Sequence, residues 1–95
     1  MVFDAYKTNK NFEVEAIQWD GQYKTLQWLI SYNLEVKNCI VNTNGSVKIL
    51  NIFNSTGSFK VKKGDYIFLV DDEFYCMSQK LFEKLFLDKI GDLVI

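Results

Sequence analysis

The pattern of apolar and polar positions is densest between residues 61 and 86. The continuous apolar run within Asp65 to Val70 is typical of a strand that is buried on both faces. Asp71 and Asp72 favour a turn, and Glu73 to Met77 then predicts the returning strand. This part of the chain therefore predicts a compact unit in which two antiparallel strands precede a helix.

A final amphipathic helix is predicted from Gln79 to Asp88, with Ser78 as its N-cap. Its apolar residues recur at helical spacing and define one face: Leu81, Phe82, Leu85 and Phe86. Gly91 favours the end of this helix. We expect Asp92 to Ile95 either to add a short strand or to pack against the core, and a free strand there would allow a homodimer across a two-fold axis.

The N-terminal part of the chain predicts a strand before the first helix. Residues 1–11 are polar and weakly patterned, which indicates a lead-in or an edge segment. From Phe12 to Trp19, apolar and polar residues alternate at first, as they do in a half-buried strand. Because Ile17 falls on the face opposite to Val14, we expect both faces of this strand to be covered near its end.

A short helix is predicted over Gln22 to Tyr32, and Asp20 is a suitable N-cap for it. Its apolar residues are spaced three and four positions apart: Tyr23, Leu26, Leu29 and Ile30. Trp28 lies off this face, where it either packs against the sheet edge or is exposed. Asn33 is expected to cap the C-terminus, because asparagine tolerates the left-handed conformation.

Three more strands complete the predicted fold. Asn38 to Thr43 and Ser46 to Phe53 flank Asn44-Gly45, a pair that favours a two-residue type I′ hairpin, and Ser58 to Lys62 alternates again. The sequence therefore predicts an α+β fold that forms a single domain over residues 1–95. We expect one curved antiparallel sheet of five to six strands with both helices on one face. One helix would follow the first strand, and the other would lie near the C-terminus.

Composition limits the chemistry that this chain can perform. Its 95 residues include no His and no Arg, so it lacks both the side chain that titrates near neutrality and the planar fork that grips phosphate. Catalysis would depend on carboxylates, Lys, Tyr or Cys with shifted pKa values. We therefore expect a protein that is not an enzyme and that carries no metal or cofactor. The net charge of −1 gives no overall attraction to nucleic acid or to an anionic membrane.

The cysteines and the absence of long apolar runs favour a cytoplasmic protein. Because disulfides are rare in the cytosol, we expect Cys39 and Cys76 to be reduced thiols on strands, and a Cys39–Cys76 disulfide is the alternative. No apolar stretch approaches the ~20 residues needed to span a bilayer. The first residues also lack the pattern of a signal peptide.

Three groups of charged residues are candidates for chemistry. The run Asp71-Asp72-Glu73 could bind a divalent cation, but its spacing differs from the calcium-loop motif and a solvated turn is favoured. Glu13 and Glu15 share a strand face, as carboxylates do on any solvated sheet. A basic strip with aromatic neighbours could bind nucleic acid. Its residues are Lys48, Lys60, Lys62 and Lys63, with Tyr66, Tyr75, Trp19 and Trp28 as the aromatic side chains. Lysines on strands also protect sheet edges from aggregation.

Short sequence blocks give the chain a resemblance to one protein family. The blocks are Glu15-Ala-Ile-Gln-Trp19 with Asp20-Gly21, then Gly64-Asp65-Tyr66-Ile67, then Glu73-Phe74-Tyr75, and finally Leu81-Phe82-Glu83-Lys84. In this order they resemble a family of small proteins encoded by phages and prophages of Gram-positive bacteria. Residues Leu34 to Lys60 match nothing specific in that family. The chain also departs from it at Lys63, where the family has Pro, and at Cys76-Met77, where the family has Pro-Cys.

The resemblance implies a phage accessory protein that is made in the cytoplasm of an infected bacterium. We expect it to act by stoichiometric binding to a host protein or a small ligand, in host takeover or counter-defence. The candidate binding residues are Trp28, as an exposed aromatic anchor, and the polar groups near strand ends, Asp65, Glu73 and Tyr75. The alternative is a nucleic-acid or nucleotide-binding module that uses Lys48, Lys60 and Lys62. An enzyme is the third hypothesis.

Overall fold

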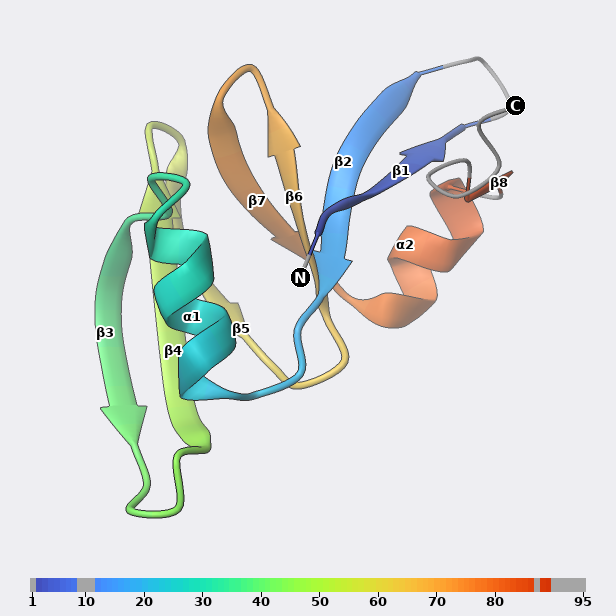
Figure 1. Ribbon diagram of the computed structural model, residues 1–95. Helices are drawn as coiled ribbons and strands as arrows, with labels where there is room; N and C mark the ends of the chain where they lie inside the picture. The colour runs from blue at the N-terminus through green and yellow to red at the C-terminus, as the bar shows by residue number, and fades with distance from the viewer. Residues whose placement is uncertain (1, 9–11, 87, 90–95) are drawn as a thin grey trace.

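The computed structural model describes residues 2–8, 12–86 and 88–89. Its elements follow in the order β1 (Asp4–Lys7), β2 (Glu13–Gln18), α1 (Tyr23–Ile30), β3 (Val36–Val41), β4 (Val47–Asn54), β5 (Gly57–Val61), β6 (Tyr66–Val70), β7 (Glu73–Met77), α2 (Gln79–Leu85) and β8 (Asp88–Lys89). Within these residues the fold is α+β, as predicted (Figure 1).

The strands form two antiparallel sheets, so the prediction of one curved sheet was wrong. A five-stranded sheet has the order β7-β6-β2-β1-β8, and a three-stranded sheet has the order β3-β4-β5. The sheets are separate because β6 pairs with β2 and not with the preceding strand β5. At this crossover the Trp19 N–H donates to the Asp65 carbonyl at 2.7 Å, and the Gly64 N–H donates to the Trp19 carbonyl at 2.9 Å.

The centre of the five-stranded sheet agrees with the sequence pattern. Strand β6 lies between β7 and β2, and its residues Tyr66, Ile67 and Phe68 are buried. Strand β2 is covered on both faces, because Val14 packs beneath α2 whereas Ile17 packs against the central core. Strand β1 lies between β2 and β8, so it is an inner strand rather than the lead-in or edge segment that we expected.

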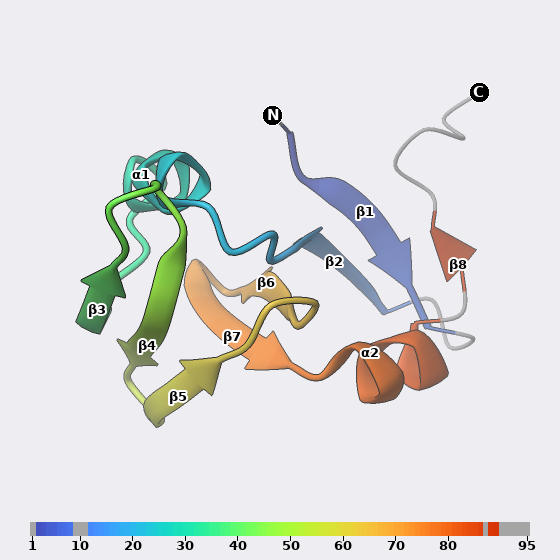
Figure 2. The same ribbon diagram turned by 90° about the horizontal axis from the view of Figure 1, so that it is seen from below.

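The two helices lie on opposite sides of the molecule, whereas we predicted both on one face of a sheet (Figure 2). Helix α1 follows the second strand rather than the first. It packs into a central core that it shares with both sheets, made of Trp19, Leu26, Leu29, Leu34, Leu50, Ile52, Val61, Ile67 and Phe74. Helix α2 covers the other face of the five-stranded sheet, where the second core consists of Val14, Ala16, Tyr66, Phe68, Phe82 and Phe86.

Helix α1 has hydrogen bonds at both ends, but the prediction that Asp20 is its N-cap was wrong, because the N-cap is Gln22 and its side chain makes no capping hydrogen bond. The Asp20 carboxylate accepts hydrogen bonds from the Gln22 N–H at 3.0 Å and from the Thr25 hydroxyl at 2.8 Å. At the other end, Asn33 has a left-handed φ of 72°. The Leu34 N–H donates to the Leu29 carbonyl at 3.2 Å, which completes a Schellman motif. The predicted apolar face is narrower than expected, because Tyr23 and Ile30 are exposed.

Helix α2 begins as predicted but is shorter and buries fewer residues. The Ser78 hydroxyl accepts a hydrogen bond from the Leu81 N–H at 3.3 Å, as the side chain of an N-cap does. The helix ends three residues before the predicted end, because Phe86 leaves the helical conformation and stacks on Phe82 with ring centroids 4.5 Å apart. Phe82 and Phe86 are buried, whereas Leu81 and Leu85 are 47% and 46% exposed.

The β3–β4 hairpin has a longer loop than the predicted two-residue type I′ turn. The Gly45 N–H donates to the Asn42 carbonyl at 3.1 Å, and the Asn42 N–H donates to the Ser46 carbonyl at 2.8 Å. Gly45 has a left-handed φ of 88°, but Asn44 does not. The Asn44 side chain instead accepts the Ser46 N–H at 3.0 Å, a local contact that favours the three-residue loop.

Two further predictions concern the C-terminal end and the membrane. The predicted helix end at Gly91 and the predicted segment Asp92 to Ile95 lie outside the described residues. In the part of the chain that the structure describes, no helix is long and apolar enough to cross a membrane.

Candidate functional site

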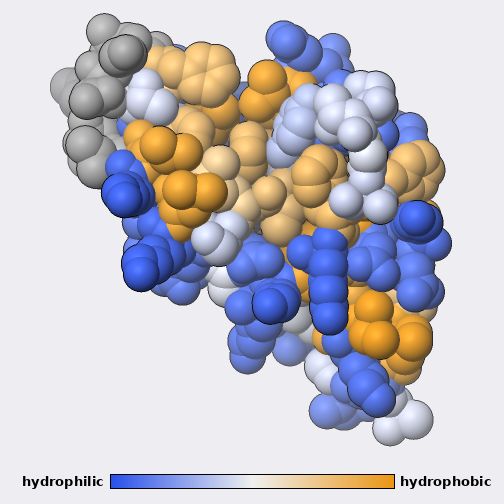
Figure 3. All heavy atoms as spheres, turned by 180° about the vertical axis from the view of Figure 1, so that it is seen from behind, coloured by the Kyte–Doolittle hydropathy of each residue, from blue (hydrophilic) through white to orange (hydrophobic). Residues whose placement is uncertain are grey.

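The outer face of the three-stranded sheet carries the largest group of predicted site residues. Its inner face packs into the central core through Leu50 and Ile52, so the alternate residues of β4 point outward. We call the outward set the basic face: Lys37, Asn38, Ile40, Lys48, Ile49, Asn51, Phe53, Ser58, Lys60 and Lys62. Figure 3 shows this side of the molecule, where long hydrophilic side chains stand beside apolar ones over β3 to β5.

Two irregularities in the strand register place lysines on this face. The pairing of β3 with β4 shifts between Val36 and Asn38, which leaves Lys37 without a partner residue on β4. It shifts again after Ile40, which leaves Lys48 without a partner residue on β3. Val36 and Val47 pack against the core, whereas both lysines are exposed. A β-bulge re-aims side chains in this way, so the bulges turn these two lysines toward solvent.

Charge is unequally distributed between this sheet and the rest of the chain. Residues 36–64 contain five lysines and no Asp or Glu, whereas the remaining residues contain six lysines and twelve acidic residues. The net charge of −1 therefore hides one basic sheet on an otherwise acidic chain. Lys37 was not among the predicted binding residues, because the total charge alone does not reveal this segment. A count of acidic residues along the chain would have found this segment.

A shallow hollow of about 400 Å³ lies on the basic face beside the β4–β5 turn. It is lined by Lys37, Phe53, Asn54, Gly57 and Ser58. Phe53 is 39% exposed, although it lies in the middle strand of the sheet. The hollow thus combines a cation, an open aromatic ring and polar groups. Sequence reasoning missed Phe53 because alternation alone does not say which face of β4 is covered.

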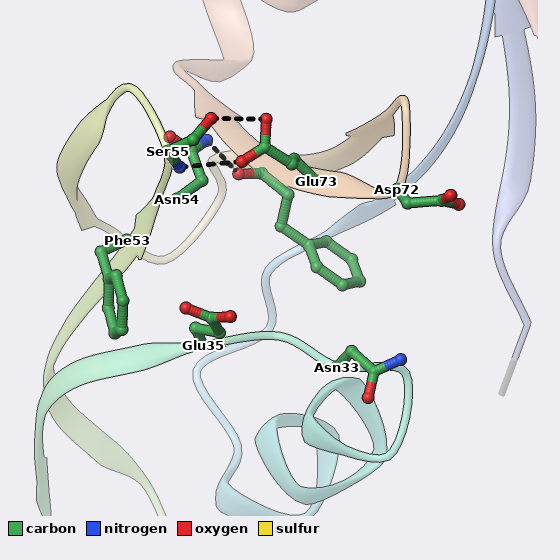
Figure 4. A pocket seen from close by; sticks show the side chains of 8 residues that line it. Asn33, Glu35, Phe53, Asn54, Ser55, Asp72 and Glu73 are labelled. Carbon is green, nitrogen blue, oxygen red and sulfur yellow. Dashed lines mark hydrogen bonds between the residues drawn. The ribbon is translucent and has the colours of Figure 1, made fainter.

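A second hollow, of about 320 Å³, lies at the junction of the two sheets (Figure 4). Its lining residues are Asn33, Glu35, Phe53, Asn54, Ser55, Asp72, Glu73 and Phe74. The Glu73 carboxylate is held by Ser55, and the Asn54 amide donates to the Phe74 carbonyl at 2.7 Å. Hydrogen bonds from the Ser55 hydroxyl and N–H lower the pKa of Glu73. Glu73 therefore joins the sheets and is not a free binding group.

The carboxylates around this junction do not converge on one point. Figure 4 shows Glu35 and Asp72 apart from the Glu73–Ser55 pair. Among the residues that the structure describes, no group of three or more His, Cys, Asp or Glu could hold a metal ion. Asp71 and Asp72 form the β6–β7 turn, as expected, and both have a left-handed φ, of 50° and 65°.

Asp65 and the two cysteines also serve the fold. The Asp65 carboxylate accepts the Lys62 N–H at 2.9 Å and the Cys76 thiol at 3.6 Å. Burial, and then the charge of Asp65 and its hydrogen bond, raise the pKa of Cys76 to about 12. Burial also raises the pKa of Cys39. Both cysteines are free, so the alternative of a disulfide between them was wrong.

The remaining candidates are aromatic residues away from the basic face. Trp28 is half-buried, with ring centroids 4.8 Å from Phe3 and 4.9 Å from Tyr32, so it packs inside a cluster rather than standing free. Tyr75 is half-buried on β7, with ring centroids 5.8 Å from Phe68 and 6.1 Å from Phe59. Trp19 and Tyr66 are buried and cannot serve as stacking surfaces.

The structure therefore groups Lys48, Lys60 and Lys62 on one face and places Trp28, Asp65, Glu73 and Tyr75 elsewhere. Comparisons of the chain with protein-family models, with curated proteins and with solved structures gave no match.

Proposed function

We propose that the protein is a phage-encoded accessory protein that acts by stoichiometric binding in the cytoplasm of an infected bacterium, with the basic face as its contact surface. The observation that carries this proposal is the segment of residues 36–64, which holds the three-stranded sheet and the turn after it and has five lysines, no acidic residue and an exposed outer side. Such a face attracts an anionic partner and repels a cationic one. The partner is accordingly a host protein with an acidic surface, or an anionic ligand.

The position of the family-like blocks supports this choice of surface. The four blocks lie on β2, β6, β7 and α2, which are three strands of the five-stranded sheet and the helix that covers it. The blocks at Trp19 and Gly64 are joined by a backbone hydrogen bond. Residues 34–60, which match none of the blocks, build most of the three-stranded sheet. This division suits a shared scaffold that presents a chain-specific surface.

Binding without turnover also fits the ionisable groups that the structure describes. The Cys76 thiol, the stronger candidate nucleophile, has a pKa raised to about 12, which disfavours the reactive thiolate. The Glu73 carboxylate is engaged by Ser55. These groups stabilise the junction between the sheets and leave the basic face as the surface for contact.

Nucleic acid is a second candidate partner, favoured by one specific observation. Lys37 and the exposed ring of Phe53 line the same hollow, so a cation and a stacking surface occur together.

Affinity capture from a host lysate tests the proposed function. We expect the wild-type protein to retain a partner in a fixed ratio and the variant Lys37→Glu/Lys60→Glu to lose it. The matched control, Lys24→Glu/Lys80→Glu, has the same net charge and changes exposed lysines on α1 and α2. Equal retention by all three proteins, or no retained partner for well-folded wild-type protein, would contradict a contact through the basic face.

A further inference from the structure

We propose that the occupant of the basic face is single-stranded nucleic acid, bound by its phosphates to the lysines and by one base stacked on Phe53. This inference rests on the proposed function, because it names the anionic partner of the same surface. It goes further by assigning separate roles to the charges, the aromatic ring and the amides of this face.

Positive charge extends across the whole width of the sheet. Lys37 lies on the edge strand β3, Lys48 on the middle strand β4 and Lys60 on the other edge strand β5. Neighbouring strands lie about 4.8 Å apart, so the three strands span about 10 Å. A polyanion that crosses the strands at Asn51 meets Lys37 and Lys60, and Lys48 lies three residues, or about 10 Å, farther along β4. Affinity for nucleic acid depends on the number of such phosphate contacts.

The ring of Phe53 adds a contact that bases make and phosphates do not. Residue Phe53 is 39% exposed and borders the hollow of about 400 Å³ that Lys37 and Ser58 also line, and it also borders the hollow that Glu35 lines. Base–aromatic stacking requires an unpaired base with a free face. The bases of a duplex stack on one another, so this contact favours single strands over double strands.

The row of the face that passes through Asn51 is polar, whereas the neighbouring row, in which Ile40 is opposite Ile49, is apolar. Asn38 is opposite Asn51, and Asn51 is opposite Lys60, so a row of amides and a cation crosses the sheet. The cores of protein–protein interfaces are depleted in charged residues, whereas nucleic-acid interfaces are more polar and more positively charged, so the polar row favours nucleic acid over an acidic protein. Side-chain amides also donate and accept hydrogen bonds at base edges.

Lysines at sheet edges have another established use, which is to prevent edge-to-edge pairing of strands. This use accounts for Lys37 on β3 and Lys60 on β5, because both are edge strands. It does not account for Lys48, which lies on the middle strand and is turned outward by a bulge. The three lysines together are better explained by a ligand that runs over the face from the row of Lys37 and Lys60 toward Lys48.

Fluorescence anisotropy with a labelled oligothymidylate of twenty nucleotides at 50 mM salt tests the inference. We expect saturable binding by the wild-type protein and weaker binding to a duplex of the same length. If Lys37, Lys48, Lys60 and Lys62 each contact one phosphate, the slope of log K against log salt concentration should be about −3. The variant Lys37→Glu/Lys60→Glu should bind at least about tenfold more weakly. Lys37→Gln/Lys60→Gln, which introduces no repulsion and is the milder change for folding, should show a smaller loss.

Two controls separate the face from general charge effects. Lys24→Glu/Lys80→Glu has the same net charge as the reversal on the basic face and should change affinity by no more than about threefold. Phe53→Leu keeps an apolar side chain but removes stacking, and it should weaken binding about fivefold or more. Phe53→Trp should retain the affinity of the wild type.

The outcomes distinguish this inference from the proposed function. Binding of polyglutamate, with loss in Lys37→Glu/Lys60→Glu but without binding of oligothymidylate, would overturn the nucleic-acid assignment and leave an anionic protein partner. Binding of neither probe would overturn both. The inference would also be overturned if Lys37→Glu/Lys60→Glu and Lys24→Glu/Lys80→Glu lost the same affinity for oligothymidylate, or if Phe53→Leu did not change that affinity.

Discussion

The Glu73 carboxylate makes two hydrogen bonds to Ser55: one oxygen accepts the backbone N–H and the other accepts the hydroxyl, each at 2.8 Å. Glu73 begins β7 in the five-stranded sheet, whereas Ser55 lies in the β4–β5 turn of the three-stranded sheet. The neighbouring hydrogen bond from Asn54 to Phe74 joins the same two segments. Together these bonds fix the basic face relative to the rest of the fold.

This contact makes stability depend on pH. Hydrogen bonds from Ser55 lower the pKa of Glu73 in the folded protein below its ordinary value of 4.5. The stabilisation is therefore complete above that value and is lost as the pH falls through the folded pKa. We expect Glu73→Ala to lower the urea midpoint at pH 7 and the difference from wild type to shrink below pH 4.5.

A double-mutant cycle with Ser55→Ala isolates the contact. In the Ser55→Ala background, Glu73→Ala should cost less stability than it does in the wild type, because one of the two hydrogen bonds is already absent. If the difference in urea midpoint between the wild type and Glu73→Ala is the same at pH 7 and at pH 3, this role for Glu73 is contradicted.

The Cys76 thiol should be unreactive in the folded protein. Its pKa is raised from 9.0 to about 12, chiefly by burial and then by Asp65, so the thiolate fraction at pH 8 is about a thousandfold below that of an ordinary cysteine. We expect slow reaction with a thiol reagent under native conditions and rapid reaction of two thiols after unfolding. Asp65→Asn should speed the native reaction of Cys76, and a native rate equal to that of free cysteine would refute the prediction.

The two exposed leucines of α2 should contribute far less to stability than the buried phenylalanine between them. Phe82 is fully buried and stacks on Tyr66 with ring centroids 4.1 Å apart. Phe82→Ala should reduce the free energy of unfolding by about 3–5 kcal/mol. Leu81→Ala should cost less than about 1 kcal/mol, because Leu81 is 47% exposed. Urea denaturation of both variants measures the contrast, and similar costs would contradict the observed orientation of α2.

The left-handed φ of 65° at Asp72 makes glycine the preferred replacement there. A residue with a Cβ atom costs about 1–2 kcal/mol in this conformation, although Asp offsets part of this cost by local hydrogen bonding. Asp72→Gly should therefore be more stable than Asp72→Ala by about 1 kcal/mol. Thermal or urea unfolding of the pair tests this, and equal stabilities would argue against the turn.

The sequence predicts most elements of this fold because local patterns determine them. The apolar run at β6, the Ser78 cap and the left-handed Asn33 were all expected from their neighbours alone and are confirmed. The bounds of β7, Glu73–Met77, agree with the predicted strand. Each of these features depends on residues within a few positions of one another.

What the sequence did not predict depends on contacts between distant residues. The choice of β2 rather than β5 as the partner of β6 is made by the hydrogen bonds between Trp19 and the turn at Gly64 and Asp65. Two sheets follow from that choice, and so do helices on opposite sides. The outward turn of Lys37 and Lys48 depends on bulges, which periodicity does not reveal. The predicted basic strip of Lys48, Lys60, Lys62 and Lys63 therefore covered only part of the basic face.

A nuclear magnetic resonance titration locates the contact surface residue by residue. Labelled protein would be titrated separately with oligothymidylate and with polyglutamate, which represent the two classes of anionic partner. We predict that at least one of them shifts the backbone amide signals of Lys37, Phe53 and Lys60 and leaves those of α1 and α2 unchanged. Shifts confined to the helices or to the β6–β7 turn, or no shifts with either polyanion, would contradict a function that is exerted through the basic face.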